Sequence, residues 1–169
     1  MKPEGWRRFF LQIEHAFVCV LFLATPSMAQ GESATMRAEI AQWAGSYETD
    51  AFLRQPAVSA ELQSLVGGEL DHLFRNLNVR GAIDVIGSTL SLSGNAPHQG
   101  TEEEAVVCVT PGRMVVEAAI LSRDTVTVYT RAKQYEHTSL CIKDWITLAN
   151  SRHADRLVRP PNVHVVRPR

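Results

Sequence analysis

None of the short motifs that mark common catalytic or nucleotide-binding sites occurs in this sequence. It has no phosphate-binding loop, no dinucleotide-binding fingerprint, no GxSxG nucleophile elbow and no HExxH zinc motif. It has only 3 cysteines, and the two that lie outside the N-terminal segment are isolated, so they do not supply the ligands that a zinc site requires. We therefore expect no cofactor and no metal, and we do not expect the chain to be an enzyme.

Long apolar runs are also scarce. Residues 17–24 form an uncharged apolar run, but it is far shorter than the ~20 residues of a membrane-spanning helix. Basic residues precede it, and Ser27-Met28-Ala29 places small residues at the two positions that signal peptidase requires. We therefore expect residues 1–29 to be a cleaved signal peptide and the mature chain to be periplasmic, without a membrane attachment. An uncleaved anchor is the alternative, and the Arg7-Arg8 pair leaves the general secretory and twin-arginine routes both open.

Basic residues are few in the body of the chain. Residues 30–150 contain 9 Lys and Arg against 15 Asp and Glu, whereas residues 151–169 contain 5 Arg and 1 Asp. An acidic body suits a basic partner and argues against nucleic acid, although this charge is also ordinary for a soluble domain. The length predicts a single domain over residues 30–150. Because residues 151–169 are rich in proline and arginine, we expect a flexible tail that hangs free or lies along the surface.

The two cysteines outside the N-terminal segment, Cys108 and Cys141, both lie in apolar segments. An even pair of cysteines in an exported protein predicts a disulfide bond. Closing the loop between them would stabilise the fold by roughly 3–4 kcal/mol in the chain-entropy model. Two buried thiols are the alternative.

The first part of the mature chain has the periodicity of helices, and the middle has that of strands. Pro56 suits the first position of a helix, and His72 falls in a later helix, where we expect it to cover a helix edge. Helices are expected at 34–43, 50–53, 56–65 and 69–77. Segments rich in Val, Ile and Thr between turn residues predict strands at 79–86, 89–93, 105–110, 113–121 and 125–131.

Short turns at 110–113 and 122–125 make the neighbouring strands antiparallel. Segment 105–110 is apolar at successive positions, which predicts a central strand covered on both faces. Residues 144–150 are expected to form a last short helix or strand. The sequence therefore predicts an α+β fold, in which N-terminal helices pack on one antiparallel β-sheet.

The candidate functional residue is His98, which lies in a turn-rich stretch between two predicted strands. Pro97 precedes it, Gly100 follows it, and three glutamates stand at 102–104. We interpret these glutamates as a solvated charge run entering a strand. A metal-assisted hydrolase that uses His98 and the glutamates is a minor alternative, because adjacent glutamates alternate in direction on an extended chain and cannot all converge on one ion.

This loop and its flanking strands resemble those of the Ivy family, the bacterial inhibitors of vertebrate-type lysozyme. The family has a protruding Cys-Lys-Pro-His-Asp-Cys loop between two strands of an antiparallel sheet, and the similarity in pattern spans roughly residues 62–145. Pro97 and His98 match the core of the loop, but both loop cysteines are absent. A disulfide holds the loop in the family, whereas here Pro97 and a turn hydrogen bond from Asn95 would hold it. The corresponding residues of this sequence are Asn95, Ala96, Pro97, His98, Gln99 and Gly100.

The resemblance implies a periplasmic inhibitor whose loop, residues 95–100, plugs the active-site cleft of a basic glycosidase, such as a C-type lysozyme or a cell-wall-degrading muramidase. The imidazole of His98 would lie between the two catalytic carboxyl groups of the cleft and hydrogen-bond both. The alternative is a non-catalytic envelope interaction or immunity module with the same fold and another target. A homodimer is left open, and nucleic acid is not expected as a partner.

Overall fold

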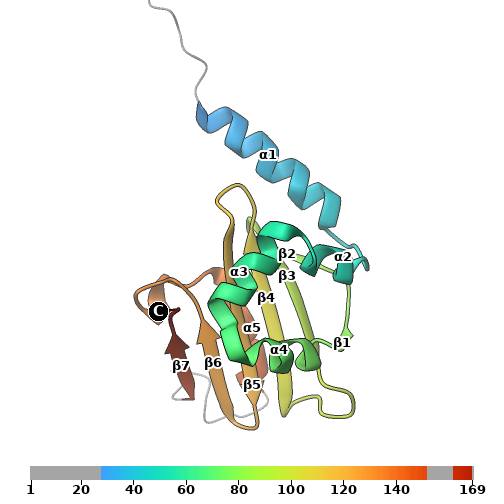
Figure 1. Ribbon diagram of the computed structural model, residues 1–169, viewed down its shortest axis with the longest axis vertical. Coiled ribbons are helices and arrows are strands. Elements are labelled where there is room, and N and C mark those ends of the chain that lie inside the picture. Colours follow the sequence, from blue (N-terminus) through green and yellow to red (C-terminus); the bar gives the residue numbers. More distant parts are fainter. Residues whose placement is uncertain (1–27, 152–161, 169) are drawn as a thin grey trace, which may run out of the picture.

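The structure is a computed structural model that describes residues 28–151 and 162–168 of the 169-residue chain. The expected signal peptide lies outside the described residues except for its last two positions, and so does the part of the expected tail at 152–161. The described chain begins with helix α1 (Met28–Trp43), which extends from one end of the molecule (Figure 1). No helix within the two described ranges is long and apolar enough to cross a membrane.

One seven-stranded sheet forms the centre of the molecule (Figure 1). Its strands are β1 (Val79–Arg80), β2 (Asp84–Ile86), β3 (Thr89–Asn95), β4 (Glu103–Thr110), β5 (Val115–Ser122), β6 (Thr125–Tyr129) and β7 (Val163–Val166). The strand order is β1-β3-β4-β5-β6-β7, and β2 also pairs with β3. The consecutive strands β3 to β6 are antiparallel, whereas β7 runs parallel to β6. The sheet is therefore antiparallel as predicted, except at its last strand.

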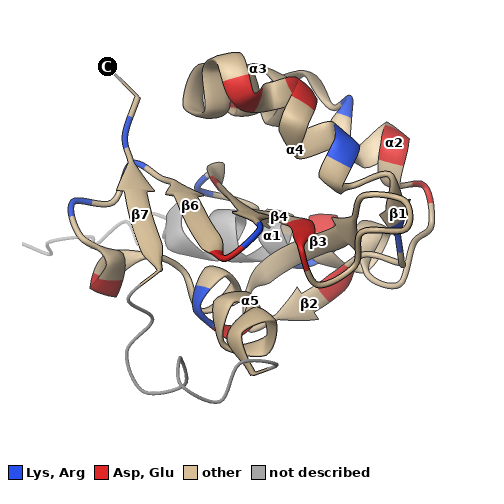
Figure 2. Ribbon diagram, turned by 90° about the horizontal axis from the view of Figure 1, so that it is seen from below, with Lys and Arg blue, Asp and Glu red and all other residues tan. Residues whose placement is uncertain are grey.

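Helices cover both faces of the sheet, and the alternation of β4 accounts for this (Figure 2). Successive residues of a strand point to opposite faces, so Val107 faces one core and Val106 faces the other. The prediction of a central strand covered on both faces is thus confirmed, as is the α+β class. One face carries α2 (Thr49–Leu53), α3 (Pro56–Val66), the 3-10 helix η1 (Gly67–Glu69) and α4 (Leu70–Asn76), and the other carries α5 (Leu140–Asn150).

Local sequence signals set the ends of the helices. Pro56 lies at the start of α3, where its missing N–H breaks no helical hydrogen bond. Gly67, with φ 59°, ends that helix. The hydroxyl of Ser139 caps α5 by accepting a hydrogen bond from a backbone N–H in its first turn at 3.3 Å. The last element, expected at 144–150, is therefore a helix, and it begins at Leu140.

Cys108 on β4 and Cys141 on α5 form a disulfide bond with an S–S distance of 2.00 Å. The sequence predicts this pair. Both residues are buried in the core between the sheet and α5, so the bond joins a central strand to the helix that covers it. Because 33 residues separate the cysteines, we expect the bond to contribute roughly 3–4 kcal/mol to stability.

The strand expected at 79–86 is divided into β1 and β2. The division falls at Ile83, whose side chain is fully buried and whose N–H donates to the carbonyl of Ser46 at 2.9 Å. Both short strands pair with β3, so they form one interrupted edge of the sheet.

The expected tail is not wholly free, which corrects the sequence-based expectation. Its residues 163–166 form β7 and pair with β6 along the edge of the sheet. The amide of Asn162 donates to the side chain of Asn150 at 3.1 Å and to the carbonyl of Asp124 at 2.9 Å. These bonds attach the end of the described chain to α5 and to the β5–β6 turn.

Candidate functional site

The loop that contains His98 joins β3 to β4 and projects beyond the end of the sheet (Figure 1). Gln99 N donates to Ala96 O at 3.0 Å, which closes a four-residue turn. Pro97 occupies the second position of this turn, and His98, with φ 63°, occupies the third. These are the features of a type II turn. Ala96 is buried and anchors the turn, while Pro97, His98 and Gln99 are exposed.

Two residues of the loop have a backbone conformation that residues other than glycine seldom adopt. His98 has φ 63° and Thr101 has φ 82°. Left-handed φ values are uncommon outside glycine, and a β-branched residue such as threonine is especially rare there. Such conformations persist only where surrounding contacts determine them, and they often mark functional loops.

Hydrogen bonds at the base of the loop supply those contacts. Ala96 N donates to Glu103 O at 2.9 Å, and Glu103 N donates to Gln99 O at 2.9 Å. Thr101 N donates to the Glu104 carboxylate at 2.8 Å. The expected turn hydrogen bond from Asn95 is present as well, because its amide donates to Ala96 O at 2.8 Å. The loop is thus closed across its base by backbone and side-chain bonds.

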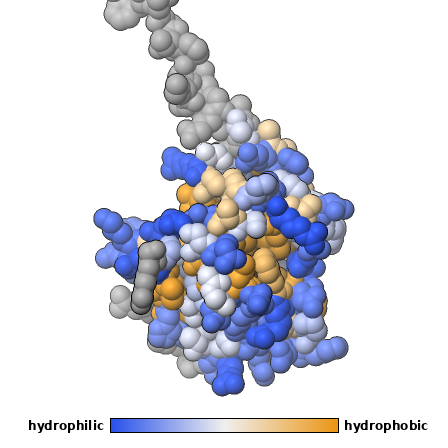
Figure 3. Space-filling model, in the orientation of Figure 1, coloured by the Kyte–Doolittle hydropathy of each residue, from blue (hydrophilic) through white to orange (hydrophobic). Residues whose placement is uncertain are grey.

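The side chain of His98 is exposed at the tip of this loop. Within residues 28–151 and 162–168, neither of its ring nitrogens makes a hydrogen bond or an ion pair. Both nitrogens are therefore available to a partner. Figure 3 shows that hydrophilic residues cover most of the lower end of the molecule, where the loop lies, and that apolar residues gather nearer the middle of this face.

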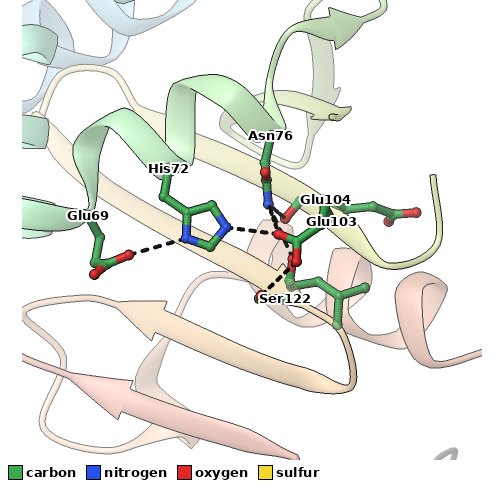
Figure 4. Close-up of polar contacts among 7 residues, drawn as sticks. Glu69, His72, Asn76, Glu103, Glu104 and Ser122 are labelled. Atoms are coloured by element: carbon green, nitrogen blue, oxygen red, sulfur yellow. Dashed lines mark hydrogen bonds and ion pairs between the residues drawn. The ribbon is translucent and has the colours of Figure 1, made fainter. Parts of the chain in front are cut away.

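Glu103 connects the loop to two other elements through its carboxylate (Figure 4). One oxygen accepts hydrogen bonds from His72 Nε2 at 2.8 Å and Asn76 Nδ2 at 3.1 Å, both on α4. The other oxygen accepts from Ser122 Oγ at 2.7 Å, at the end of β5. His72 Nδ1 lies 3.2 Å from the carboxylate of Glu69, the last residue of η1 before α4. We call these five residues the Glu103 cluster.

Glu103 and His72, at the centre of the Glu103 cluster, are largely shielded from solvent, and their contacts shift the pKa of the Glu103 carboxylate. The side chain of Glu103 is 15% exposed and that of His72 is 21% exposed. Burial raises the pKa of Glu103, but hydrogen bonds from His72, Ser122 and Asn76, together with the charge of His72, lower it by more. The pKa of Glu103 therefore lies below its ordinary value of 4.5.

The expectation of a solvated charge run at 102–104 is wrong for two of its three glutamates. Glu102 is exposed, but Glu103 is partly buried and Glu104 is 8% exposed. The expectation for His72 is also incomplete, because this residue bonds across to β4 rather than merely covering a helix edge. No group of three His, Cys, Asp or Glu side chains in the described part of the chain is placed to hold a metal ion.

A second buried carboxylate, Glu117, was not identified from the sequence. It accepts hydrogen bonds from Thr130 Oγ1 at 2.6 Å and from the N–H of Ser139 at 2.8 Å. Ser139 is the capping residue of α5, so Glu117 fixes the start of that helix to the sheet. This contact lies at the end of the sheet opposite the His98 loop, and we assign it a structural role.

A shallow hollow of about 460 Å³ lies beside the base of the loop, between the β1–β3 edge and α5. Trp145 forms part of its wall, and two strongly exposed apolar residues, Val79 and Leu148, border it. It adds an irregular surface next to the loop, against which the rim of a bound partner could pack.

Comparison with known proteins connects this geometry to a family. Neither the curated proteins nor the solved structures include a significant match to the chain. A family model described as inhibitor of vertebrate lysozyme (Ivy) matches residues 57–151. The matched region contains the His98 loop, the Glu103 cluster and both bridged cysteines. Because it covers more than half of the sequence, the chain belongs to the Ivy family of inhibitors of vertebrate lysozyme.

Proposed function

We propose that this chain inhibits a lysozyme-type glycosidase by inserting the Pro97-His98 turn into the active-site cleft of that enzyme. Membership of the Ivy family supports lysozyme inhibition in general. The finer proposal rests on one observation: His98 stands exposed at the tip of a loop that is closed by hydrogen bonds and has a left-handed backbone at two residues. An imidazole that is exposed and has no partner among the described residues is suited to binding groups on another protein.

The chemistry of the target explains why an imidazole would be effective. A lysozyme-type cleft holds two carboxyl groups on either side of the bond that it cleaves. An imidazole has a nitrogen on each side of its ring, so it can hydrogen-bond both groups at once. If His98 is protonated, both nitrogens donate and the charge adds to the attraction. The same side chain would also exclude the substrate from the cleft.

The order of the free loop supports tight binding. Ordering a flexible loop on association costs roughly 0.5–1.5 kcal/mol for each immobilised side chain. Here the turn is already closed by the bond between Gln99 N and Ala96 O, and its base is closed by Ala96 N and Glu103 O. Less free energy is therefore spent on ordering the loop when it enters the cleft.

The proposed site of action is the periplasm. The expected signal peptide at residues 1–29 would export the chain, and the Cys108–Cys141 disulfide suits an oxidising compartment. An inhibitor there would meet a lysozyme that attacks the cell wall. A cell-wall-degrading muramidase is a second target with the same pair of carboxyl groups.

The test is inhibition by a His98→Ala variant against a panel of C-type lysozymes and muramidases. As a central, desolvated contact, His98 should be worth about 2 kcal/mol, so inhibition should weaken about thirtyfold. His137→Ala and His164→Ala are matched controls, because both histidines are exposed and lie away from the loop. Both controls should inhibit like the parent.

Two outcomes would contradict the proposal. A folded His98→Ala variant that inhibits as well as the parent would rule out insertion of the imidazole. A parent protein that inhibits no member of the panel would rule out the glycosidase target, and an envelope interaction or immunity role would replace it.

A further inference from the structure

The His98 loop has no covalent bridge of its own, because no cysteine lies between β3 and β4. Other contacts must therefore hold its shape. We infer that Glu103 is the positioning residue of this loop: its backbone closes the loop, and its side chain fixes the loop to α4 and β5. The structural role of Glu103 does not depend on what the protein binds, but the importance of that role for inhibition rests on the function proposed above. Glu103 does not touch the target in this scheme and acts only through the orientation of His98.

The backbone of Glu103 makes two of the bonds that close the loop. Its carbonyl accepts from Ala96 N and its N–H donates to Gln99 O, each at 2.9 Å. These two partners are the first and last residues of the turn that carries His98. Any displacement of Glu103 therefore moves both ends of the turn.

The side chain of Glu103 restrains that backbone from two directions. His72 and Asn76 hold one carboxylate oxygen from α4, and Ser122 holds the other from β5. Bonds to an ionised group are roughly twice as strong as neutral ones. Removing the carboxylate would leave His72 Nε2 and Ser122 Oγ without this acceptor in a largely shielded place, which is costly. Asn76 Nδ2 would keep its longer bonds to the carbonyls of Glu104 and Leu121, at 3.4 Å and 3.3 Å. The cluster thus opposes relaxation of the strained loop.

The neighbouring Glu102 provides a matched control. It has the same side chain one residue away, but that side chain is exposed and makes no hydrogen bond or ion pair among the described residues. Its backbone carbonyl accepts from Arg123 N at 2.6 Å, and Glu102→Ala would retain this bond. The two alanine variants remove the same atoms and differ in whether the cluster is broken.

The first measurement is amide hydrogen exchange in the free protein, which requires no target. Glu103→Ala should speed exchange at Ala96 and Gln99 by at least about tenfold through local opening. Glu102→Ala should leave both rates unchanged. Exchange in β5 reports global stability and should change less than exchange in the loop. If Glu103→Ala does not fold, Ser122→Ala removes one bond of the cluster and should give a smaller change in the same direction.

The second measurement is rescue by a cross-link. A Cβ atom placed on Gly100 would lie 3.8 Å from Asn95 Cγ, so side chains at these two positions are in reach of each other. Combining Asn95→Cys and Gly100→Cys with Glu103→Ala should restore slow exchange in the oxidised protein. Mild reduction should abolish the rescue, because the new bridge is exposed whereas Cys108 and Cys141 are buried. Peptide mapping would confirm the pairing.

The inhibition assay then connects the loop to function. Glu103→Ala should inhibit about tenfold less than the parent, the oxidised cross-linked variant should recover most of that loss, and Glu102→Ala should inhibit like the parent. Unchanged loop exchange in a folded Glu103→Ala variant would overturn the inference. The inference would also be overturned if the oxidised cross-linked variant regained slow exchange in the loop but did not regain inhibition. If the parent inhibits nothing, the proposed function fails, while the exchange data still decide whether Glu103 orders the loop.

Discussion

At the scale of single residues, the ionisation of Glu103 makes the stability of the protein depend on pH. The pKa of Glu103 is lowered below 4.5 in the folded protein by its hydrogen bonds and by the charge of His72, which outweigh the effect of burial. A lowered folded-state pKa means that the ionised group stabilises the fold above the unfolded-state pKa. That contribution is lost as the pH falls through the lowered folded-state value.

We therefore predict a pH-dependent difference in unfolding free energy between the parent and Glu103→Gln, which cannot ionise. The parent should be the more stable protein above about pH 5, and the difference should shrink steadily as the pH falls below that value. Urea unfolding at a series of pH values would measure it. His72 is the titratable group bonded to Glu103 and itself contacts Glu69, so repeating the series in a His72→Gln background separates its titration. A difference that grows on acidification would contradict the assigned sign.

The residues of the site differ in how far the sequence predicts them. Pro97 and His98 are identified by local turn chemistry, because proline is favoured at the second position of a turn. The left-handed φ of His98 is not predicted, since histidine gives no such signal. Glu103 is missed because its partner His72 is 31 residues away. That contact depends on how α4 crosses the start of β4, which no local pattern contains.

At the scale of elements, the periodicity of the sequence predicts the order of the helices and of the central strands. It does not predict the two edges of the sheet. Strand β4 is predicted because it is apolar toward both faces. Strand β7 is missed because a four-residue segment among prolines and arginines resembles a linker. Its pairing depends on the open edge of β6, which only the folded sheet provides.

We predict that removing residues 152–169 destabilises the domain by about 1–3 kcal/mol while leaving it folded. The truncation exposes the edge of β6 and removes the bonds from Val126 N to Asn162 O at 2.9 Å and from Thr130 N to Val166 O at 3.2 Å. Thermal or urea unfolding would measure the loss. Removing residues 168–169 alone is the control and should have little effect. Equal stability of the long truncation and the parent would show that β7 contributes nothing.

At the scale of the whole molecule, charge is distributed unevenly between the two ends of the sheet. Three glutamates at 102–104 and Asp124 lie at the end that carries the His98 loop, because Glu103 pairs with Ser122 at the start of the β5–β6 turn. Arg123 lies in the same turn, and Arg80 pairs with Gly94 near the loop. Strands β4 to β7 place Arg113, Arg131, Lys133 and Arg167 at the other end, where Glu61 pairs with Arg131 and Glu117 is buried. Such a separation orients the molecule in the field of a charged partner.

This asymmetry should act on the rate of association with a basic lysozyme, because it turns the loop toward the partner before contact. Raising the ionic strength from about 0.01 M to 0.1 M shortens the Debye length from about 30 Å to 10 Å. We predict that the association rate falls about tenfold over this range while the dissociation rate changes little. Asp124→Asn should slow association modestly, because Asp124 is exposed at the end that carries the loop. Arg113→Gln, the control at the opposite end, should not slow it. Surface plasmon resonance at several salt concentrations would test this, and an association rate independent of salt would show that the acidic end does not steer the encounter.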